Sequence, residues 1–283
     1  MRLRRYLDGD LPRLGVESDG GLVPLPPAPN SLVDLMHDEA ALREARALAT
    51  RPAGPPHSSL AGVTTLAPIE RPAKIVAIGR NYREHIDEEG ADAPPEPLIF
   101  AKFPSSVIGP DVDISWSERL TSQVDYEAEL GVIIGRLARN VTPTNATDFI
   151  FGYTCLNDVS ARDLQFSDGQ WVRGKSLDTF TPMGPSVVTV DEVPDPQDLS
   201  IRCLVNGEVM QEASTAQMHF TVAELVAYCS SYFTLEPGDV IATGTPGGVG
   251  VFRTPPRFLR DGDEVVVEID HVGKLRNRCS SFA

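Results

Sequence analysis

The segment from Val124 to Ile134 constrains the fold of this chain most strongly, because acidic and apolar residues alternate in it before it becomes wholly apolar. Its sequence is VDYEAELGVII. Successive side chains of an extended strand point to opposite faces, so Asp125, Glu127 and Glu129 would share one face. The following GVII run is too apolar for a strand lying in water. The pattern therefore predicts a strand that enters the core with two or three carboxylates at its mouth.

Carboxylates that share a buried face repel one another unless a cation lies between them. Oxygen ligands without a nearby His or Cys indicate Mg²⁺, Mn²⁺ or Ca²⁺ rather than Zn²⁺. The alternative is an edge strand whose acidic face is solvated, and this segment alone does not decide between the two.

A second acidic position favours the metal site. The apolar run 149–156 predicts a strand that ends at Asn157 and Asp158. An Asp at the end of a buried strand can complete a three-carboxylate Mg²⁺ site, and it can also cap a helix. Arg162 and Gln165 follow at helical spacing and would point the same way, while Lys175 adds a cation near the carboxylates.

Elsewhere, short apolar runs alternate with turn signals, and Gly and Pro make up about a sixth of the chain against a usual ~12%. This favours a strand-rich body over a helical bundle. Asn206-Gly207 predicts a hairpin turn. Thr221, with Glu224 three residues later, predicts the capping box of a helix over 221–233. Further strands are expected over 74–78, 130–134, 186–190, 199–205, 240–243 and 264–269.

The first 66 residues are expected to form a small separate unit, with residues 67–283 as the main domain. Leu3–Tyr6 and 14–16 would pair as strands around an Asp-Gly turn. Ser31 would cap a helix with apolar residues from Leu32 to Leu48 on one face. The proline-rich stretch 51–56 cannot continue that helix and is interpreted as a linker.

The net charge of −15 and the isoelectric point near 4.7 argue against a nucleic-acid partner. No apolar run reaches the ~18–20 residues that cross a bilayer, so no membrane association is expected. The basic start of the chain lacks the apolar core of a secretory signal, and we expect a cytoplasmic location. The four scattered cysteines (Cys155, Cys203, Cys229 and Cys279) are expected to be reduced packing residues.

Two loops have alternative interpretations. Residues 87–97 are acidic and proline-bearing, which is more typical of a mobile lid than of a core element. Residues 244–250 are glycine-rich but lack the Lys-Ser/Thr ending of a phosphate loop. We expect the backbone of that loop to approach a small anionic substrate.

Taken together, five motifs resemble the fumarylacetoacetate hydrolase family, in family order over residues 70–280. They are IGRNYREH (78–85), DYEAELG (125–131), NDVSARDLQ (157–165), GKS with DTF (174–180) and PGDVIATGTP (237–246). The resemblance implies an α+β, predominantly β fold: a mixed β-sandwich roll as catalytic domain, preceded by a small α/β appendage. It also suggests a homodimer.

The resemblance also implies roles for individual residues. Glu127, Glu129 and Asp158 would bind Mg²⁺ or Mn²⁺. His85 would be the general base, with Glu88 as its acidic partner and Lys175 as a catalytic cation. Arg162, Gln165 and Thr245 would bind the substrate. Residues 76–78 lack the further Asp ligand of the enzyme that names the family, which favours a bacterial member of the acylpyruvase or oxaloacetate decarboxylase kind.

The leading hypothesis is therefore a metal-dependent enzyme that hydrolyses a C–C bond in acylpyruvate-type 2,4-diketo acids through a metal-stabilised enolate. Oxaloacetate decarboxylation is the first alternative. Isomerisation or hydration of 2-hydroxy-dienoic acids is the second. Hydrolysis, decarboxylation, tautomerisation and dehydration share the same enolate, so the motifs indicate the intermediate better than the reaction. A homologue that binds a metal and a keto acid without turnover is the remaining alternative, and retention of the base argues against it.

Overall fold

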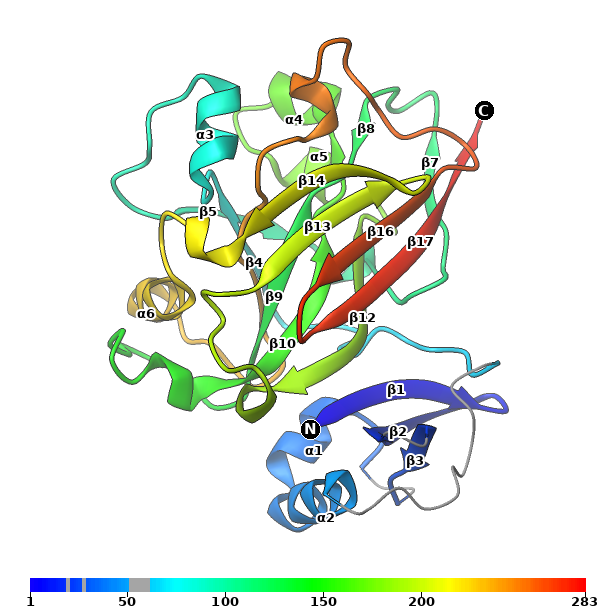
Figure 1. Cartoon of the computed structure of the whole chain (residues 1–283), viewed down its shortest axis with the longest axis vertical. Helices are drawn as coiled ribbons and strands as arrows, with labels where there is room; N and C mark the ends of the chain where they lie inside the picture. Colours follow the sequence, from blue (N-terminus) through cyan, green and yellow to red (C-terminus); the bar gives the residue numbers. More distant parts are fainter. Residues whose placement is uncertain (19–20, 27–28, 51–61) are drawn as a thin grey trace.

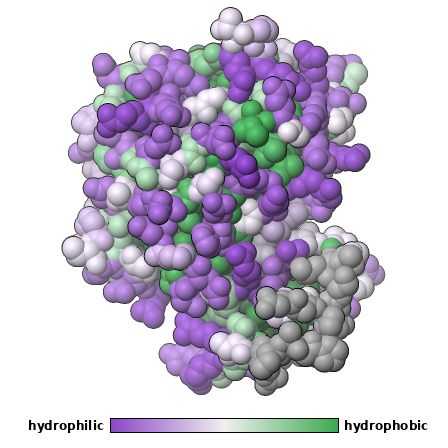
Figure 2. All heavy atoms as spheres, in the orientation of Figure 1, coloured by the Kyte–Doolittle hydropathy of each residue, from purple (hydrophilic) through white to green (hydrophobic). Residues whose placement is uncertain are grey.

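The computed structural model describes residues 1–18, 21–26, 29–50 and 62–283. The fold is α+β and mostly β, as predicted, and within these residues the strands form three sheets. The N-terminal strands and the first two helices lie together at one end of the molecule, below the main body in Figure 1. Hydrophilic side chains cover most of the face shown in Figure 2, and apolar atoms show between them in separate areas.

The largest sheet carries the candidate site and has ten strands. Along its path the order is β3 (Gly21–Pro24), β2 (Leu11–Ser18), β1 (Arg2–Asp8), β12 (Thr181–Thr189), β10 (Ile150–Asn157), β9 (Ala128–Ile134), β15 (Val240–Ala242), β4 (Ile75–Gly79) and β5 (Leu98–Lys102), with β6 (Val107–Ile108) beside β12. β1 pairs with β12, so the N-terminal strands extend the sheet of the main body. The division at residue 66 stays a prediction.

A second sheet packs against the first. Its five strands are β14 (Glu208–Ser214), β13 (Ser200–Val205), β16 (Glu264–Ile269), β17 (Gly273–Phe282) and β7 (Ile114–Ser117). The third sheet pairs only β8 (Val124–Asp125) with β11 (Ser160–Ala161). The helices are α1 (Leu32–His37), α2 (Glu39–Ala49), α3 (Arg83–Glu89), α4 (Arg162–Ser167), α5 (Val172–Lys175) and α6 (Val222–Tyr232). Short 3₁₀ turns occur at Pro104–Ser106, Ala146–Phe149, Val190–Glu192, Thr215–Gln217 and Gly250–Phe252.

Both faces of the central strands are buried, which explains why their sequences read as continuous apolar runs. In β9, Leu130 and Val132 belong to the core shared with the five-stranded sheet. Ile133, on the opposite face, packs in the core that contains Leu32 and Leu35 of α1. The N-terminal unit therefore covers one face of the catalytic sheet.

The predicted strands, the Asn206-Gly207 turn and the capping box of α6 are all present. The single helix predicted after Ser31 is wrong in one respect, because it is divided into α1 and α2. Asp38 stands between them in an extended conformation, and its carboxylate accepts the backbone N–H groups of Ala40 and Ala41. An acidic side chain that caps a new helix ends the old one. The predicted linker 51–56 lies outside the described residues. The four cysteines are buried and free, as predicted.

Candidate metal centre and active site

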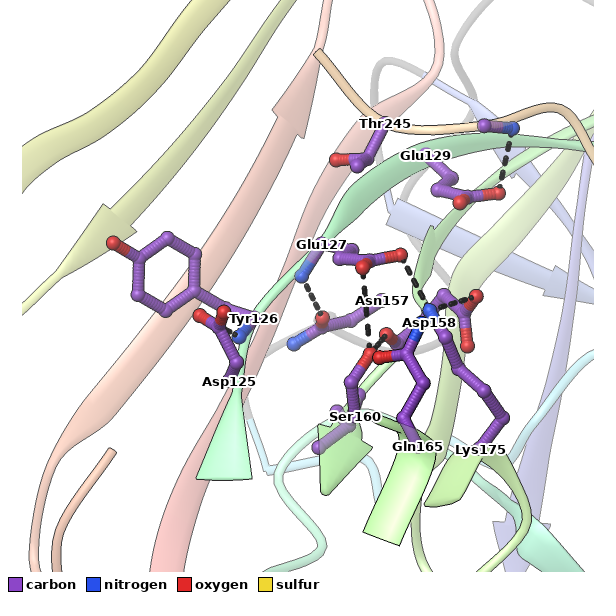
Figure 3. A network of polar contacts seen from close by, with 12 residues as sticks. Asp125, Tyr126, Glu127, Glu129, Asn157, Asp158, Ser160, Gln165, Lys175 and Thr245 are labelled. Atoms are coloured by element: carbon purple, nitrogen blue, oxygen red, sulfur yellow. Dashed lines mark hydrogen bonds and ion pairs between the residues drawn. The ribbon is translucent and has the colours of Figure 1, made fainter. Parts of the chain in front are cut away.

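Three predicted metal ligands meet at the junction of β9 and β10. Glu129 lies in β9, Glu127 lies just before that strand, and Asp158 directly follows β10. The two strands are antiparallel neighbours, and the Asp158 N–H donates to the Glu127 carbonyl at 2.9 Å. One carboxylate oxygen of each residue lies within 4.8 Å of the others, and all three side chains are buried (Figure 3).

Asp125 does not join this group, so the prediction of one continuous strand face is wrong at that residue. The chain leaves the extended pairing between β8 and β9, where the N–H groups of Glu127 and Ala128 donate to the side chains of Asn157 and Gln211. These two side chains supply the acceptors that the backbone of a neighbouring strand would otherwise supply. Asp125 instead accepts the Nε of Arg162 at 2.9 Å.

Three buried cations form ion pairs with two of the three carboxylates, Glu127 and Asp158. Lys175 Nζ lies 2.7 Å from Glu127 Oε2 and 2.8 Å from Asp158 Oδ2. Arg162 Nη1 lies 2.7 Å from Glu127 Oε1. Lys102 Nζ lies 2.6 Å from Asp158 Oδ1. None of them forms an ion pair with Glu129 in the described part of the chain, and Glu129 instead accepts the N–H of Gly244 at 2.9 Å.

The carboxylate pKa values reflect this unequal pairing. Burial raises the pKa of Glu129 well above its usual value, and the nearby charges of Asp158 and Glu127 raise it further. Burial also tends to raise the pKa of Glu127, but Lys175 and Arg162 outweigh it, and the value falls to about 2. Glu129 is therefore the carboxylate that lacks a positive charge.

The residues present fit a divalent cation. The donor set is three hard carboxylate oxygens, which suits Mg²⁺, Ca²⁺ or Mn²⁺. The Lys175 ammonium already bridges two of the three carboxylates. The third is the one whose pKa burial and negative neighbours raise. A cation between the three would remove that imbalance.

His85 and Glu88 lie on α3, beside the acidic group. His85 Nδ1 lies 2.7 Å from Glu88 Oε1, and Glu88 Oε2 accepts the N–H of Gly248 at 2.8 Å. His85 also lines the pocket described below. α3 includes residues 87–89, the beginning of the predicted lid. It ends at Glu89, and its C-cap residue Gly90 has a left-handed φ of 65°. Mobility of residues 87–97 stays a prediction.

One pocket collects most of the predicted site residues. Arg162 donates to Gln165 Oε1 at 3.0 Å, and Thr245 donates to the Ala128 carbonyl at 3.0 Å. The enclosed volume is about 30 Å³, room for one or two waters. Its walls include the predicted residues His85, Glu127, Glu129, Arg162, Gln165, Lys175 and Thr245, and the apolar side chains of Phe100, Phe166, Trp171 and Phe252.

The glycine-rich loop differs from its prediction. The N–H groups of Gly244, Gly248 and Gly250 donate to Glu129, Glu88 and Asp125 respectively. They are therefore occupied by the acidic residues of the site instead of pointing at a free anion. The loop holds these carboxylates in place.

Sequence reasoning missed two buried residues. Lys102 ends β5, an edge strand that was not predicted, and its only sequence signal is a charge within the run LIFAKF. Burial lowers the pKa of Lys102, and the Asp158 carboxylate opposes this shift. Gln211 of β14 accepts from Ala128 and donates to Thr245 Oγ1 and the Pro246 carbonyl at 2.8 Å. It connects the start of β9 with the loop 244–250, and a polar residue in a hairpin strand gives no signal of such a contact.

Comparison with known proteins identifies the family of this chain. The family model described as "Fumarylacetoacetate (FAA) hydrolase C-terminal" matches residues 74–280. The chain belongs to the fumarylacetoacetate hydrolase family. The predictions of the family and of an enzyme are thereby confirmed.

The relatives in this family differ in activity. The chain is 46% identical to the mitochondrial oxaloacetate tautomerase FAHD2A of Bos taurus, over 94% of this chain and 87% of that protein. A putative HpcE protein of Mycobacterium smegmatis has a TM-score of 0.88 and 38% identity over the whole of both chains. A maleylpyruvate hydrolase of Sphingobium sp. SYK-6, in complex with manganese(II) and pyruvate, has a TM-score of 0.81 and 33% identity over the whole of both chains.

The expected cytoplasmic location is contradicted, because the bovine relative is mitochondrial. The expectation rested on the absence of a secretory signal, and that absence does not separate the remaining compartments. Among the described residues, no helix combines the length and the apolar character needed to cross a membrane.

Proposed function

We propose that this chain catalyses keto–enol tautomerisation of oxaloacetate or a closely related small 2-oxo dicarboxylic acid. The observation that carries the proposal is the pocket in which two carboxylates of the triad, Glu127 and Glu129, share a wall with His85, whose ring is oriented by Glu88. The likeness to the bovine tautomerase supports the same substrate class.

Glu127, Glu129 and Asp158 would hold the divalent metal. When bound there, Mg²⁺ or Mn²⁺ supplies a Lewis acid that polarises the 2-oxo group and stabilises negative charge on its oxygen. The carboxylates contribute by fixing three oxygens within 4.8 Å of one another.

His85 would move the proton at C3 of the substrate. Its Nδ1 is held by Glu88, so Nε2 is available to take the C3 proton of the keto form, which leaves the enolate, and to give that proton to the 2-oxygen, which completes the enol. The reverse reaction would run the same two proton transfers backwards. Lys175, on the pocket wall, would stabilise the developing oxyanion. Arg162 and Gln165 would bind the substrate carboxylate, and Thr245 would contact its other end.

The test follows the loss of oxaloacetate enol by ultraviolet absorbance, with Mg²⁺, Mn²⁺ or EDTA. Wild type should accelerate equilibration only with metal. His85→Gln should reduce the rate by about 10²-fold or more, as for loss of general acid–base catalysis. The matched control is His37→Gln, an exposed histidine at the end of α1, which should behave as wild type. Equal rates with EDTA and with metal would refute the proposal.

Hydrolysis of an acylpyruvate is the second candidate, favoured by the His85–Glu88 pair and by the likeness to the maleylpyruvate hydrolase. A base oriented by a carboxylate suits activation of water. Loss of acetylpyruvate, measured in parallel, would support hydrolysis if it needs both metal and His85. Pyruvate formed from oxaloacetate would instead identify the decarboxylase, above all if it survives His85→Ala. The predicted homodimer and the absence of nucleic-acid and membrane partners stay predictions.

A further inference from the structure

Lys102 is a buried cation that the proposed reaction does not use. It ends β5 and is 2% exposed. Its Nζ lies 2.6 Å from Asp158 Oδ1, and it donates to the backbone carbonyls of Lys175 and Val159. A carboxylate and two carbonyls are three acceptors, and an ammonium has three donors. The ion pair with Asp158 opposes the lowering of the Lys102 pKa that burial causes.

Lys102 does not line the pocket, whereas Lys175 does. The two lysines hold different oxygens of Asp158, Lys102 at Oδ1 and Lys175 at Oδ2. Any effect of Lys102 on a bound substrate must therefore act through charge or through Asp158, since it makes no direct contact with the pocket.

The charges around the triad nearly cancel. We call seven charged side chains around the triad, each at least nine-tenths buried, the inner charge cluster. Its members are the carboxylates Asp125, Glu127, Glu129 and Asp158 and the cations Lys102, Arg162 and Lys175. With all of them ionised the cluster carries one negative charge, so a divalent cation leaves it with one positive charge. Without Lys102, the loaded cluster would be neutral.

We propose that Lys102 sets the charge of the loaded metal centre so that it attracts a 2-oxo carboxylate. The residue opposes metal binding and favours anion binding, and its removal therefore shifts the two affinities in opposite directions. This inference rests on the proposed function for the class of anion.

Loss of the Lys102 side chain should change the charge beside Asp158 but leave the position of Asp158 nearly unchanged. Asp158 would keep its ion pair with Lys175 at 2.8 Å and the hydrogen bond from its N–H to the Glu127 carbonyl at 2.9 Å. Its own carbonyl would still accept the hydroxyl of Ser160 at 3.0 Å. Three contacts that do not involve Lys102 therefore still hold Asp158 in place.

The test uses the full chain carrying Lys102→Met, which keeps an unbranched side chain and removes the charge. Mn²⁺ affinity is measured from free Mn²⁺ by electron paramagnetic resonance. Pyruvate affinity is measured by titration calorimetry on Mn²⁺-saturated protein. Removing one unit charge beside a buried binding site changes affinity by about tenfold or more. We therefore expect Mn²⁺ to bind at least ~10-fold more tightly and pyruvate at least ~10-fold more weakly.

The matched control is Lys74→Met. Lys74 also pairs with a buried carboxylate, Asp239, at 2.9 Å, but lies outside the inner charge cluster. It should leave both affinities unchanged. Lys102→Gln, which keeps hydrogen-bond donors without the charge, is the second variant and should reproduce the opposed shifts.

Weaker binding of both ligands, or no change in either, would overturn the proposal, because a merely structural role moves the two affinities together. Failure of both Lys102 variants to fold, when Lys74→Met folds, would also overturn it. Neither affinity requires turnover. A wild type without activity on oxaloacetate would refute the proposed function and leave the opposed shifts to be judged by themselves.

Discussion

Substitution of Asp125 by Asn separates a structural carboxylate from a metal ligand. Asp125 accepts four hydrogen bonds: from the N–H groups of Tyr126, Gly250 and Val251 at 2.9, 2.8 and 3.0 Å, and from Arg162 Nε at 2.9 Å. Each oxygen receives two of them. An Asn amide nitrogen in place of either oxygen would face two donors.

The expected loss of stability follows from those contacts. Leaving two buried donors without an acceptor costs about 1–3 kcal/mol each, and breaking a buried ion pair costs about 3–5 kcal/mol. With the amide nitrogen in place of Oδ2, Arg162 is one of the two donors, so the two costs overlap and are not summed, and we expect roughly 3–5 kcal/mol. With an unfolding entropy of about 2.1 cal/mol/K per residue and 283 residues, this lowers Tm by about 5–8 °C. Mn²⁺ should still bind, because the triad lacks Asp125, but more weakly than in wild type, because the substitution removes one negative charge from the inner charge cluster.

Thermal unfolding by circular dichroism and Mn²⁺ titration check the two parts of this prediction. Asp239→Asn is the matched control. Asp239 is also buried and accepts the N–H groups of Lys74 and Glu236 at 2.9 and 2.7 Å, away from the pocket. It should lower Tm without changing Mn²⁺ binding or activity. A D125N protein with unchanged Tm and lost Mn²⁺ binding would refute the reasoning and make Asp125 a metal ligand.

Three further predictions concern the same site. The raised pKa of Glu129 means that the metal-free native state binds more protons than the unfolded state, so this residue's contribution to stability falls as pH rises from about 4.5 towards the native pKa. Denaturant titrations of metal-free protein between pH 4 and 8 should show that fall in wild type and not in Glu129→Gln, and a pH-independent difference between the two proteins would contradict it. Mn²⁺ at about 100 times its Kd should stabilise wild type by about 2.7 kcal/mol, or ~4–5 °C in Tm, and EDTA should reverse this in the same scan. At Gly248 the φ is 97° and a Cβ would lie 2.3 Å from the Met210 carbonyl, so Gly248→Ala should displace the N–H that holds Glu88. Its kcat should fall about tenfold or more with Mn²⁺ affinity retained, whereas Gly207→Ala, at a positive φ but in open space, should leave kcat unchanged.

Local chemistry made much of the fold predictable. Asn206-Gly207 forms its turn because both residues adopt positive φ, and Thr221 with Glu224 caps α6 through adjacent backbone groups. The triad could be predicted for a similar reason, because the position of an apolar strand determines where the polar residues at its end lie. β17 was missed although Leu275, Asn277 and Cys279 alternate inward, because its outward residues are charged and its inward ones are not all apolar.

The features that sequence reasoning missed depend on partners distant in the chain. The break between β8 and β9 occurs because Asn157 and Gln211 accept backbone N–H groups that a neighbouring strand would otherwise bind. Nothing in residues 124–134 encodes those partners. The same holds for Lys102, whose significance depends on Asp158, 56 positions further along the sequence.

The density of buried charge is itself an argument for function. Buried ion pairs are weak sources of stability, because desolvation of both partners offsets their attraction, and well-packed apolar residues often serve as well or better. In this chain the inner charge cluster brings four carboxylates and three cations, each at least nine-tenths buried, around one point. One of the carboxylates, Glu129, forms no ion pair among the described residues and has a raised pKa. A cluster maintained for stability alone would balance its charges within the protein. The remaining negative charge, located among three oxygens within 4.8 Å of one another, is balanced when Glu129 takes up a proton or when a cation binds there. A divalent cation leaves the cluster with one positive charge, which suits an anionic substrate. Without metal the inner charge cluster has an excess of negative charge. We therefore expect the metal to bind first and the anionic substrate second.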